Sequence, residues 1–196
     1  MQPFTHLRAL AAPLEGRNVD TDQIIPARFL KKNRDALYKT YLFHDLRFDE
    51  HGALRPDFTL NRPLFQGAQI LVADENFGCG SSREGAVYCL SDFGIRAILA
   101  PSFGDIFFNN ALKNGLLPIR LNPAQIQQLF ELVQHDPQTV CQIDLVQQMI
   151  LIGTVFSATF EINAFSKHCL LEGLDELGYT LKLLPQIEAF EKSRSL

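Results

Sequence analysis

The stretch QILVADENFGCGSSREGAVYCLSDFGIRAILAP, residues 69–101, decides the fold class. It opens with a short apolar run typical of a buried strand, and it closes with a second such run. Between them lie a glycine-rich loop and a segment with helical spacing of apolar residues, which ends at Gly94, a residue type common just after a helix. This strand–helix–strand order predicts parallel β-α-β units and an α/β fold.

The same alternation continues to residue 121. FGDIFFNNALKNG (103–115) predicts a second helix closed by Gly115, and LLPIRL (116–121) predicts a third strand. Proline has no N–H to donate to a neighbouring strand. Pro118 therefore places this strand at a sheet edge or at a bulge.

Beyond residue 121 the pattern changes to a longer helix and further strands. NPAQIQQLFELVQHDP predicts a helix with Asn122 as its N-cap and Pro123 at its first position. We interpret residues 140–162 as a β-hairpin that turns near Gly153, and residues 163–196 as largely helical.

The first third of the chain is patterned less regularly. Residues 1–16 lead into the polar turn GRNVDTDQIIP, and residues 29–66 mix aromatic, charged, proline and glycine residues without a period. We expect loops and short helices laid over a core there, and loop-rich segments of that length are commonly functional. The expected organisation is a single domain over residues 1–196, with a core at about 5–160 and a C-terminal helical extension at about 161–196.

The chain has 196 residues, of which 46% are hydrophobic and 20% are charged, a composition typical of a globular protein. A net charge of −4 without a Lys/Arg block argues against a nucleic-acid partner. The N-terminal segment has the pattern of neither a signal peptide nor a membrane span, so we expect a cytoplasmic protein without a membrane partner.

The cysteines are far apart and form no C-x-x-C pair, so we expect neither a metal site on this chain nor a disulfide. They are Cys79, Cys89, Cys141 and Cys169.

The loop NFGCGSSREGA (76–86) has two interpretations. A strand, a glycine-rich loop and a helix N-terminus form a common anion site, in which Gly78 and Gly80 let a ligand approach the backbone. Alternatively, Ser81 and Glu84 form an S-x-x-E capping box, in which the serine bonds the backbone and carries out no chemistry. Because two serines are adjacent, one could cap the helix while the other faces a ligand.

Nucleotide-binding and serine-hydrolase patterns do not fit this loop. GCGSSREG lacks the third glycine of G-x-G-x-x-G and the lysine of a P-loop, and the chain contains no G-x-S-x-G. Arg83 is unfavourable for the start of a helix, which prefers anions, but it suits a carboxylate ligand held by a bidentate contact. The alternative is an ion pair with Glu84 or with the nearby acids Asp74 and Glu75.

A second polar cluster, Asp20, Thr21 and Asp22, lies in the turn at residues 16–26. Such residues most often form an Asx-turn or a helix N-cap. They could also bring a carboxylate and a hydroxyl to a site.

Taken together and in this order, GRNVDTDQIIPARFLK, ILVADENFGCGSSREGAVYCLSDFGIRAILAPSF and IFFNNALKNGLLPI resemble the small-subunit family of 3-isopropylmalate dehydratase in the aconitase superfamily. The resemblance runs over roughly residues 5–160. It implies a swivelling β/β/α domain like the C-terminal domain of aconitase, with mixed sheets and flanking helices. It also implies a hydro-lyase that is active only with a large subunit, which would carry a 4Fe–4S cluster on its own cysteines.

The implied reaction converts 2-isopropylmalate to 3-isopropylmalate through 2-isopropylmaleate, in leucine biosynthesis. In this superfamily the first serine of S-S-R removes the proton next to a carboxylate of a dicarboxylic 2-hydroxy acid, and that serine corresponds to Ser81. The resemblance assigns substrate binding to Ser82, Arg83, Thr21, Asp22 and, by spacing, Arg34, with the loop backbone at Gly78, Cys79 and Gly80.

The stretch from Lys31 to Glu50 lacks an R-T-G segment that many isopropylmalate small subunits have. The small subunit of a related hydro-lyase, such as homoaconitase or a citraconate or alkylmalate hydratase, is therefore an alternative. A non-catalytic anion-binding subunit is another.

A serine base needs strong stabilisation of its alkoxide. A helix N-terminus supplies about 1 to 2 kcal/mol, equivalent to roughly 1.5 pKa units. Arg83, backbone donors of the glycine loop and a closed, water-poor site would have to supply the rest. We therefore expect proton removal only after closure onto the large subunit.

Overall fold

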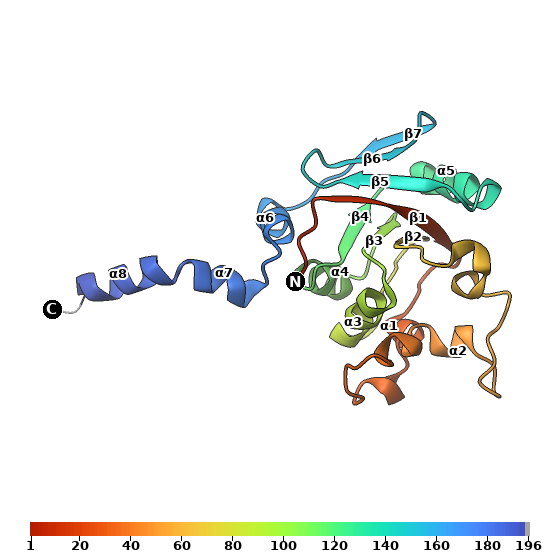
Figure 1. Cartoon of the computed structure of the whole chain (residues 1–196), viewed down its shortest axis with the longest axis horizontal. Helices are drawn as coiled ribbons and strands as arrows, with labels where there is room; N and C mark the ends of the chain where they lie inside the picture. Colours follow the sequence, from red (N-terminus) through yellow and green to blue (C-terminus); the bar gives the residue numbers. More distant parts are fainter. Residues whose placement is uncertain (195–196) are drawn as a thin grey trace.

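The computed structural model describes residues 1–194, and within them seven strands form one mixed sheet (Figure 1). The strand order is β4-β3-β2-β1-β5-β6-β7. Neighbours from β1 to β4 are parallel, whereas β1, β5, β6 and β7 pair antiparallel. The strands are β1 His6–Leu14, β2 Ile70–Ala73, β3 Ala97–Ala100, β4 Leu117–Arg120, β5 Val140–Asp144, β6 Met149–Ile152 and β7 Phe156–Thr159.

The central strand, β1, joins the parallel and antiparallel parts of the sheet. Its first half pairs with β5 from His6 to Leu10, and its second half pairs with β2 from Ala11 to Leu14. No strand was expected in this segment. The reason is physical: the first half is partly exposed and the second fully buried, so its sequence shows neither a continuous apolar run nor a clean alternation.

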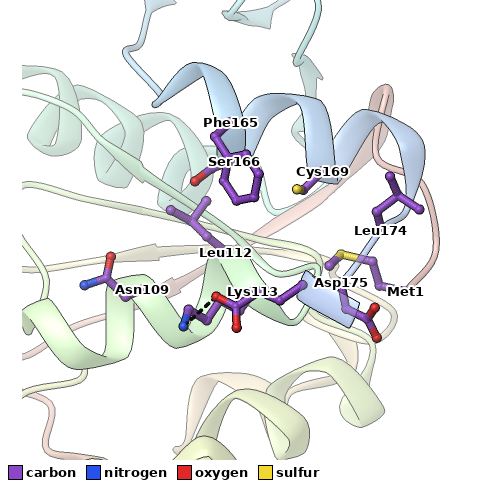
Figure 2. Close-up of a pocket in the computed structure, with 10 residues that line it drawn as sticks. Met1, Asn109, Leu112, Lys113, Phe165, Ser166, Cys169, Leu174 and Asp175 are labelled. Atoms are coloured by element: carbon purple, nitrogen blue, oxygen red, sulfur yellow. Dashed lines mark ion pairs between the residues drawn. The ribbon is translucent and has the colours of Figure 1, made fainter. Parts of the chain in front are cut away.

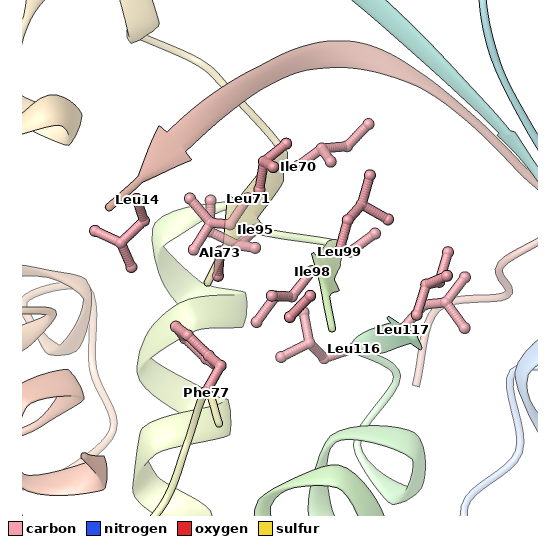
Figure 3. Packing of buried hydrophobic residues seen from close by; sticks show 14 of the residues in the cluster. Leu14, Ile70, Leu71, Ala73, Phe77, Ile95, Ile98, Leu99, Leu116 and Leu117 are labelled. Carbon is pink, nitrogen blue, oxygen red and sulfur yellow. The ribbon is translucent and has the colours of Figure 1, made fainter. Parts of the chain in front are cut away.

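Both strands of the opening stretch are confirmed, and every residue of β2 and β3 is buried. Helix α3 (Glu84–Phe93) follows β2, and α4 (Asp105–Lys113) follows β3. Figure 1 shows these two helices on one side of the strands and α5 (Pro123–His135) on the other. With both faces covered, the parallel strands form the centre of the apolar core, which Figure 3 shows around Leu71, Ile98 and Phe77.

Two helix ends have the capping residues that the sequence predicts. Gly94 ends α3 with φ 114°, and Asn122 caps α5 through a hydrogen bond from the Gln125 N–H at 2.8 Å. β4 lies at the edge of the sheet, as Pro118 predicted.

The predicted hairpin at residues 140–162 contains three strands instead of two. A turn near Gly153 is confirmed, but a second turn separates β5 from β6 between Leu145 and Gln148. Gln148 has φ 55°, a left-handed conformation, and it is the last residue of this turn, directly before β6.

Short helices lie between β1 and β2, as expected for that irregular segment. They are α1 Thr21–Ile24, η1 Ala27–Phe29, η2 Tyr38–Tyr41, α2 His44–Arg47, η3 Thr59–Asn61 and η4 Pro63–Phe65.

The C-terminal segment is helical, as expected, in α6 (Ala164–Glu172), α7 (Glu176–Lys182) and α8 (Leu184–Arg194); the last two residues of the predicted extension lie outside the described part of the chain. Figure 1 shows α7 and α8 extending away from the sheet. Across residues 1–194, no helix combines the length and the apolar character needed to cross a bilayer.

Candidate active site

Three loops meet at the carboxyl ends of the parallel strands β1, β2 and β3. Hydrogen bonds join them: the Asn18 N–H donates to the Glu75 carbonyl at 2.9 Å, and the Phe77 N–H donates to the Ser102 carbonyl at 3.1 Å. In open α/β sheets this edge is the usual place for ligand binding. The glycine-rich loop with its two serines lies here, and Asp20, Thr21 and Asp22 lie at the start of α1, directly after the loop that follows β1.

The turn before α1 runs alongside the glycine loop, with an isolated parallel bridge between Asp20 and Cys79. The Gly78 N–H donates to the Val19 carbonyl at 2.7 Å, and the Thr21 N–H donates to the Cys79 carbonyl at 2.9 Å. The sequence clusters at residues 20–22 and 78–83 are therefore in direct contact.

The two loop glycines are required for packing within the protein. Gly78 has φ 71° and Gly80 has φ 90°, conformations that favour glycine. A side-chain carbon on Gly78 would overlap the Phe107 ring, and one on Gly80 would overlap the Asp20 carboxylate. These positions were expected to leave room for a ligand; in the structure, the room left by the missing side chains is filled by protein atoms.

Ser81 and Ser82 are both exposed, and within residues 1–194 neither hydroxyl forms a hydrogen bond with another protein group. The N-cap of α3 is Arg83, and no side chain caps that helix. The Glu84 carboxylate accepts instead from Asn114 Nδ2 at 3.0 Å. The S-x-x-E capping box is therefore not formed, and both hydroxyls are available to a ligand.

Arg83 pairs with Asp22 across the two clusters. Its two terminal nitrogens contact the two carboxylate oxygens, with Nη2 donating to Oδ2 at 2.5 Å. The Arg83 side chain is 12% exposed and that of Asp22 is 52% exposed. Asp74 and Glu75, which the sequence offered as partners, lie 3.7 Å from Arg17 instead. The structure thus brings together two residues that the resemblance assigned to substrate binding.

Asp20 and Thr21 hold α1 and the serine loop in place through hydrogen bonds to the backbone. The Asp20 carboxylate caps α1 by accepting from the Asp22 N–H at 2.6 Å, which is the N-cap role considered for this cluster. Thr21 is 2% exposed, and its hydroxyl donates to the Ser81 carbonyl at 2.8 Å. The Thr21 hydroxyl therefore faces the loop backbone and not the surface.

Arg34 does not join the cluster. Its Nε and Nη2 donate to the Asp92 carboxylate at 2.8 and 2.6 Å, and its guanidinium lies 4.3 Å from the centre of the Tyr88 ring. The hydrogen bond with Asp92 raises the pKa of Arg34. Asp92 is in the last turn of α3, whereas Ser81 and Arg83 precede its first turn. The spacing along the sequence predicted that Arg34 lies near Ser81 and Arg83, but the fold places it at the opposite end of α3.

The four cysteines of this chain have free thiols, and three of them are buried. Burial, and then the charge of Asp20, raise the pKa of Cys79 above its ordinary value. Burial raises the pKa of Cys89 and Cys141 to about 12. The described residues contain no group of three or more His, Cys, Asp or Glu side chains that could hold a metal ion. The donor set on this part of the chain does not fit an iron–sulfur cluster, which takes clustered thiolates.

A separate pocket of about 180 Å³ lies between α4 and the α6–α7 segment (Figure 2). Its lining is mainly apolar, and its lysine, Lys113, is paired with Glu176 at 2.8 Å. No predicted site residue lines it. The lining residues are Met1, Asn109, Leu112, Lys113, Phe165, Ser166, Cys169, Leu174, Asp175 and Glu176.

Sequence reasoning did not single out three polar residues that hold the loops together. Asn76 Nδ2 donates to Asn18 Oδ1 at 2.8 Å, and the Asn76 N–H donates to Ser102 Oγ at 2.9 Å. Asn18 and Asn76 have φ 57° and 61°, which asparagine tolerates better than most residues. The sequence feature that could have indicated these loop contacts is an asparagine shortly after each of two strands, Asn18 after β1 and Asn76 after β2.

Comparison with known proteins agrees with this architecture. Residues 1–124 match the family described as the aconitase C-terminal domain. The chain is 48% identical to the 3-isopropylmalate dehydratase small subunit of Paramagnetospirillum magneticum, over 99% of this chain and 96% of that protein. It is 47% identical to the subunit of the same name from Neisseria meningitidis, over 99% of this chain and 95% of that protein.

A crystal structure of 3-isopropylmalate dehydratase from Methanocaldococcus jannaschii superposes with a TM-score of 0.67 at 29% identity, covering 95% of this chain and 99% of that one. The predicted fold class, an α/β swivelling domain with a mixed sheet and flanking helices, is confirmed. The near-complete coverage of named relatives at almost half identity also confirms the resemblance. The chain therefore belongs to the family of 3-isopropylmalate dehydratase small subunits, with the fold of the aconitase C-terminal domain.

Proposed function

We propose that this chain is the small subunit of a hydro-lyase that interconverts 2-isopropylmalate and 3-isopropylmalate through 2-isopropylmaleate, in leucine biosynthesis. The relatives at 47–48% identity support this assignment. The observation that supports the site is the pair of exposed, unbonded serine hydroxyls on the two residues directly before Arg83, at the start of α3.

Ser81 is the proposed base. Its alkoxide takes the proton from the carbon next to a substrate carboxylate, and the C–H electron pair becomes the second C–C bond as the hydroxyl leaves the neighbouring carbon. Return of the proton from Ser81 to the carbon that lost the hydroxyl, with hydroxide added at the carbon that lost the proton, completes the isomerisation and restores the alkoxide. The α3 N-terminus contributes about 1 to 2 kcal/mol to the alkoxide, so Arg83 and exclusion of water must contribute more.

Arg83 is the proposed carboxylate ligand, with Ser82 beside it. The bidentate contact between Arg83 and Asp22 supports this role, because Asp22 presents to the guanidinium the group that a substrate carboxylate would present. Asp22 would then give way to the substrate or bind beside it, consistent with its exposed side chain.

The charges of the cluster support a requirement for the large subunit. Asp20 and Asp22 provide two carboxylates against the single guanidinium of Arg83, so the isolated cluster is a poor site for a dianion. The partner would have to supply further cations and exclude water. Because the thiols of this chain do not form a ligand set, we assign the 4Fe–4S cluster to the large subunit.

We expect the complex to act in the cytoplasm on a small dicarboxylic 2-hydroxy acid, without a nucleic-acid or membrane partner. The net charge of −4 and the lack of a Lys/Arg block support the expectation that nucleic acid is not a partner.

The test is turnover by the complex reconstituted with its large subunit, with a panel of alkylmalates as substrates. Ser81→Ala should lower kcat by about 10²–10⁴-fold, as expected for loss of a positioned base. Ser82→Ala is the matched control and should raise KM more than it lowers kcat. Size-exclusion chromatography should show that both variants assemble with the large subunit. Near-normal kcat in assembled Ser81→Ala complex would refute the proposed role.

A further inference from the structure

We propose that Thr21 is a positioning residue, which fixes the backbone of Ser81 and thereby aims its hydroxyl, and that it does not itself bind substrate. This inference rests on the proposed function of Ser81. The resemblance assigned Thr21 to substrate binding because of its position in the T-D motif, and the contacts of Thr21 indicate a different task.

The hydroxyl of Thr21 is buried and already bonded. Thr21 is 2% exposed, and its hydroxyl donates to the Ser81 carbonyl at 2.8 Å across 60 positions of the chain. Its N–H donates to the Cys79 carbonyl at 2.9 Å. One residue therefore holds the loop on both sides of Gly80.

Ser81 needs such an anchor because its own side chain has none within the described structure. Its hydroxyl is exposed and unbonded, and the residue before it is Gly80, which has φ 90° and no side chain to restrict its backbone. This part of the loop is restrained by the two hydrogen bonds of Thr21 and by the contacts of Arg83 with Asp22 and the Ile25 carbonyl. Of these, the hydrogen bond from the Thr21 hydroxyl is the one that Ser81 itself accepts. A base misplaced by about 1 Å can lose about 10²-fold in rate.

Thr139 provides a matched comparison. It is the other buried polar residue of the described chain, 8% exposed, and its hydroxyl donates to the Asp136 carbonyl at 2.5 Å. That bond spans three positions at the end of α5 and contacts no predicted site residue. Thr139→Val therefore removes a buried threonine hydroxyl without touching the loop.

The experiment is steady-state kinetics of the reconstituted complex. Thr21→Val keeps the shape and removes the donor, and it should lower kcat by about 10- to 100-fold with little change in KM. Thr21→Ser keeps the donor and should restore most of the lost kcat. Thr139→Val should leave kcat unchanged even where it lowers the thermal midpoint. If Thr21→Val does not fold, Thr21→Ala compared with Thr21→Ser gives the same contrast.

A double-mutant cycle then tests whether Thr21 acts through Ser81. In the Ser81→Ala background, Thr21→Val should cause no further loss of kcat. Unchanged kcat in Thr21→Val, equal losses in the valine and serine variants, or a raised KM with normal kcat would each overturn the inference. The proposed function fails on a different result, namely normal turnover by Ser81→Ala, so the two failures are distinguishable.

Discussion

At the scale of single residues, the site depends on how closely two backbone segments approach. Gly80 lies against the Asp20 carboxylate, which in turn caps α1. The same contact holds the turn that carries Asp22 and the loop that carries Ser81. A side chain at position 80 would push these two segments apart, with consequences for stability and for the geometry of the site.

We predict that Gly80→Ala destabilises the chain more than Gly16→Ala does. Both glycines have positive φ, 90° and 113°, which costs an alanine about 1–2 kcal/mol. Only Gly80 would also meet protein atoms, because a side-chain carbon at Gly16 has nothing within 4 Å. Overpacking adds about 1–3 kcal/mol. Urea unfolding of the two variants measures the difference, and equal losses would contradict the steric account.

Most residues of the candidate site come from one contiguous loop with chemically distinctive residue types, so the sequence alone could propose them. What could not be predicted was the direction of individual side chains. Arg83 could have paired with Asp74, Glu75 or Glu84 by proximity in sequence, but its partner, Asp22, is 61 positions away. That pairing depends on β1 lying next to β2, and the sequence pattern did not indicate β1.

At the scale of elements, α3 links the predicted site to the segment between α1 and β2. Its first turn follows the serine loop, and its last turn carries Asp92, which holds Arg34. The elements of residues 69–121 were predictable because both faces of their strands are covered, which produces continuous apolar runs. β1 and the turn at 145–148 were not, because half-buried strands and left-handed turns by non-glycine residues leave weak signals.

The Arg34–Asp92 contact predicts a structural effect for Arg34. Their side chains are 48% and 26% exposed, so the pair should stabilise the fold by at most about 1 kcal/mol. Arg34→Gln should therefore lower the free energy of unfolding by no more than that, with kcat and KM unchanged. Asp92→Asn is the control: it removes the ion pair but keeps the contact of Arg34 with the Tyr88 ring, so its loss should be no larger than that of Arg34→Gln. A raised KM in Arg34→Gln alone would instead support the substrate-binding role assigned by spacing.

At the scale of the whole molecule, the described chain consists of a sheet with helices on both faces and a helical segment that extends from it (Figure 1). α6 packs on the body through Cys169 and Leu170, which are buried. α7 forms one ion pair with α4, between Glu176 and Lys113 at 2.8 Å, and one with α6, between Lys182 and Glu172 at 2.9 Å. α8 has no buried residue between Leu184 and Arg194, and its apolar side chains are exposed.

This arrangement predicts that α8 contributes little to the stability of the isolated chain. A chain that stops at Leu183 should unfold in urea with a free energy within about 0.5 kcal/mol of the full chain, the range expected for changes confined to exposed residues. Leu170→Ala is the control for a residue that does contribute. Because Leu170 is fully buried in α6, that variant should lose about 2–5 kcal/mol. A large loss of stability on removing α8 would mean that it packs against the body in solution, contrary to the exposure of Leu184 and Phe190.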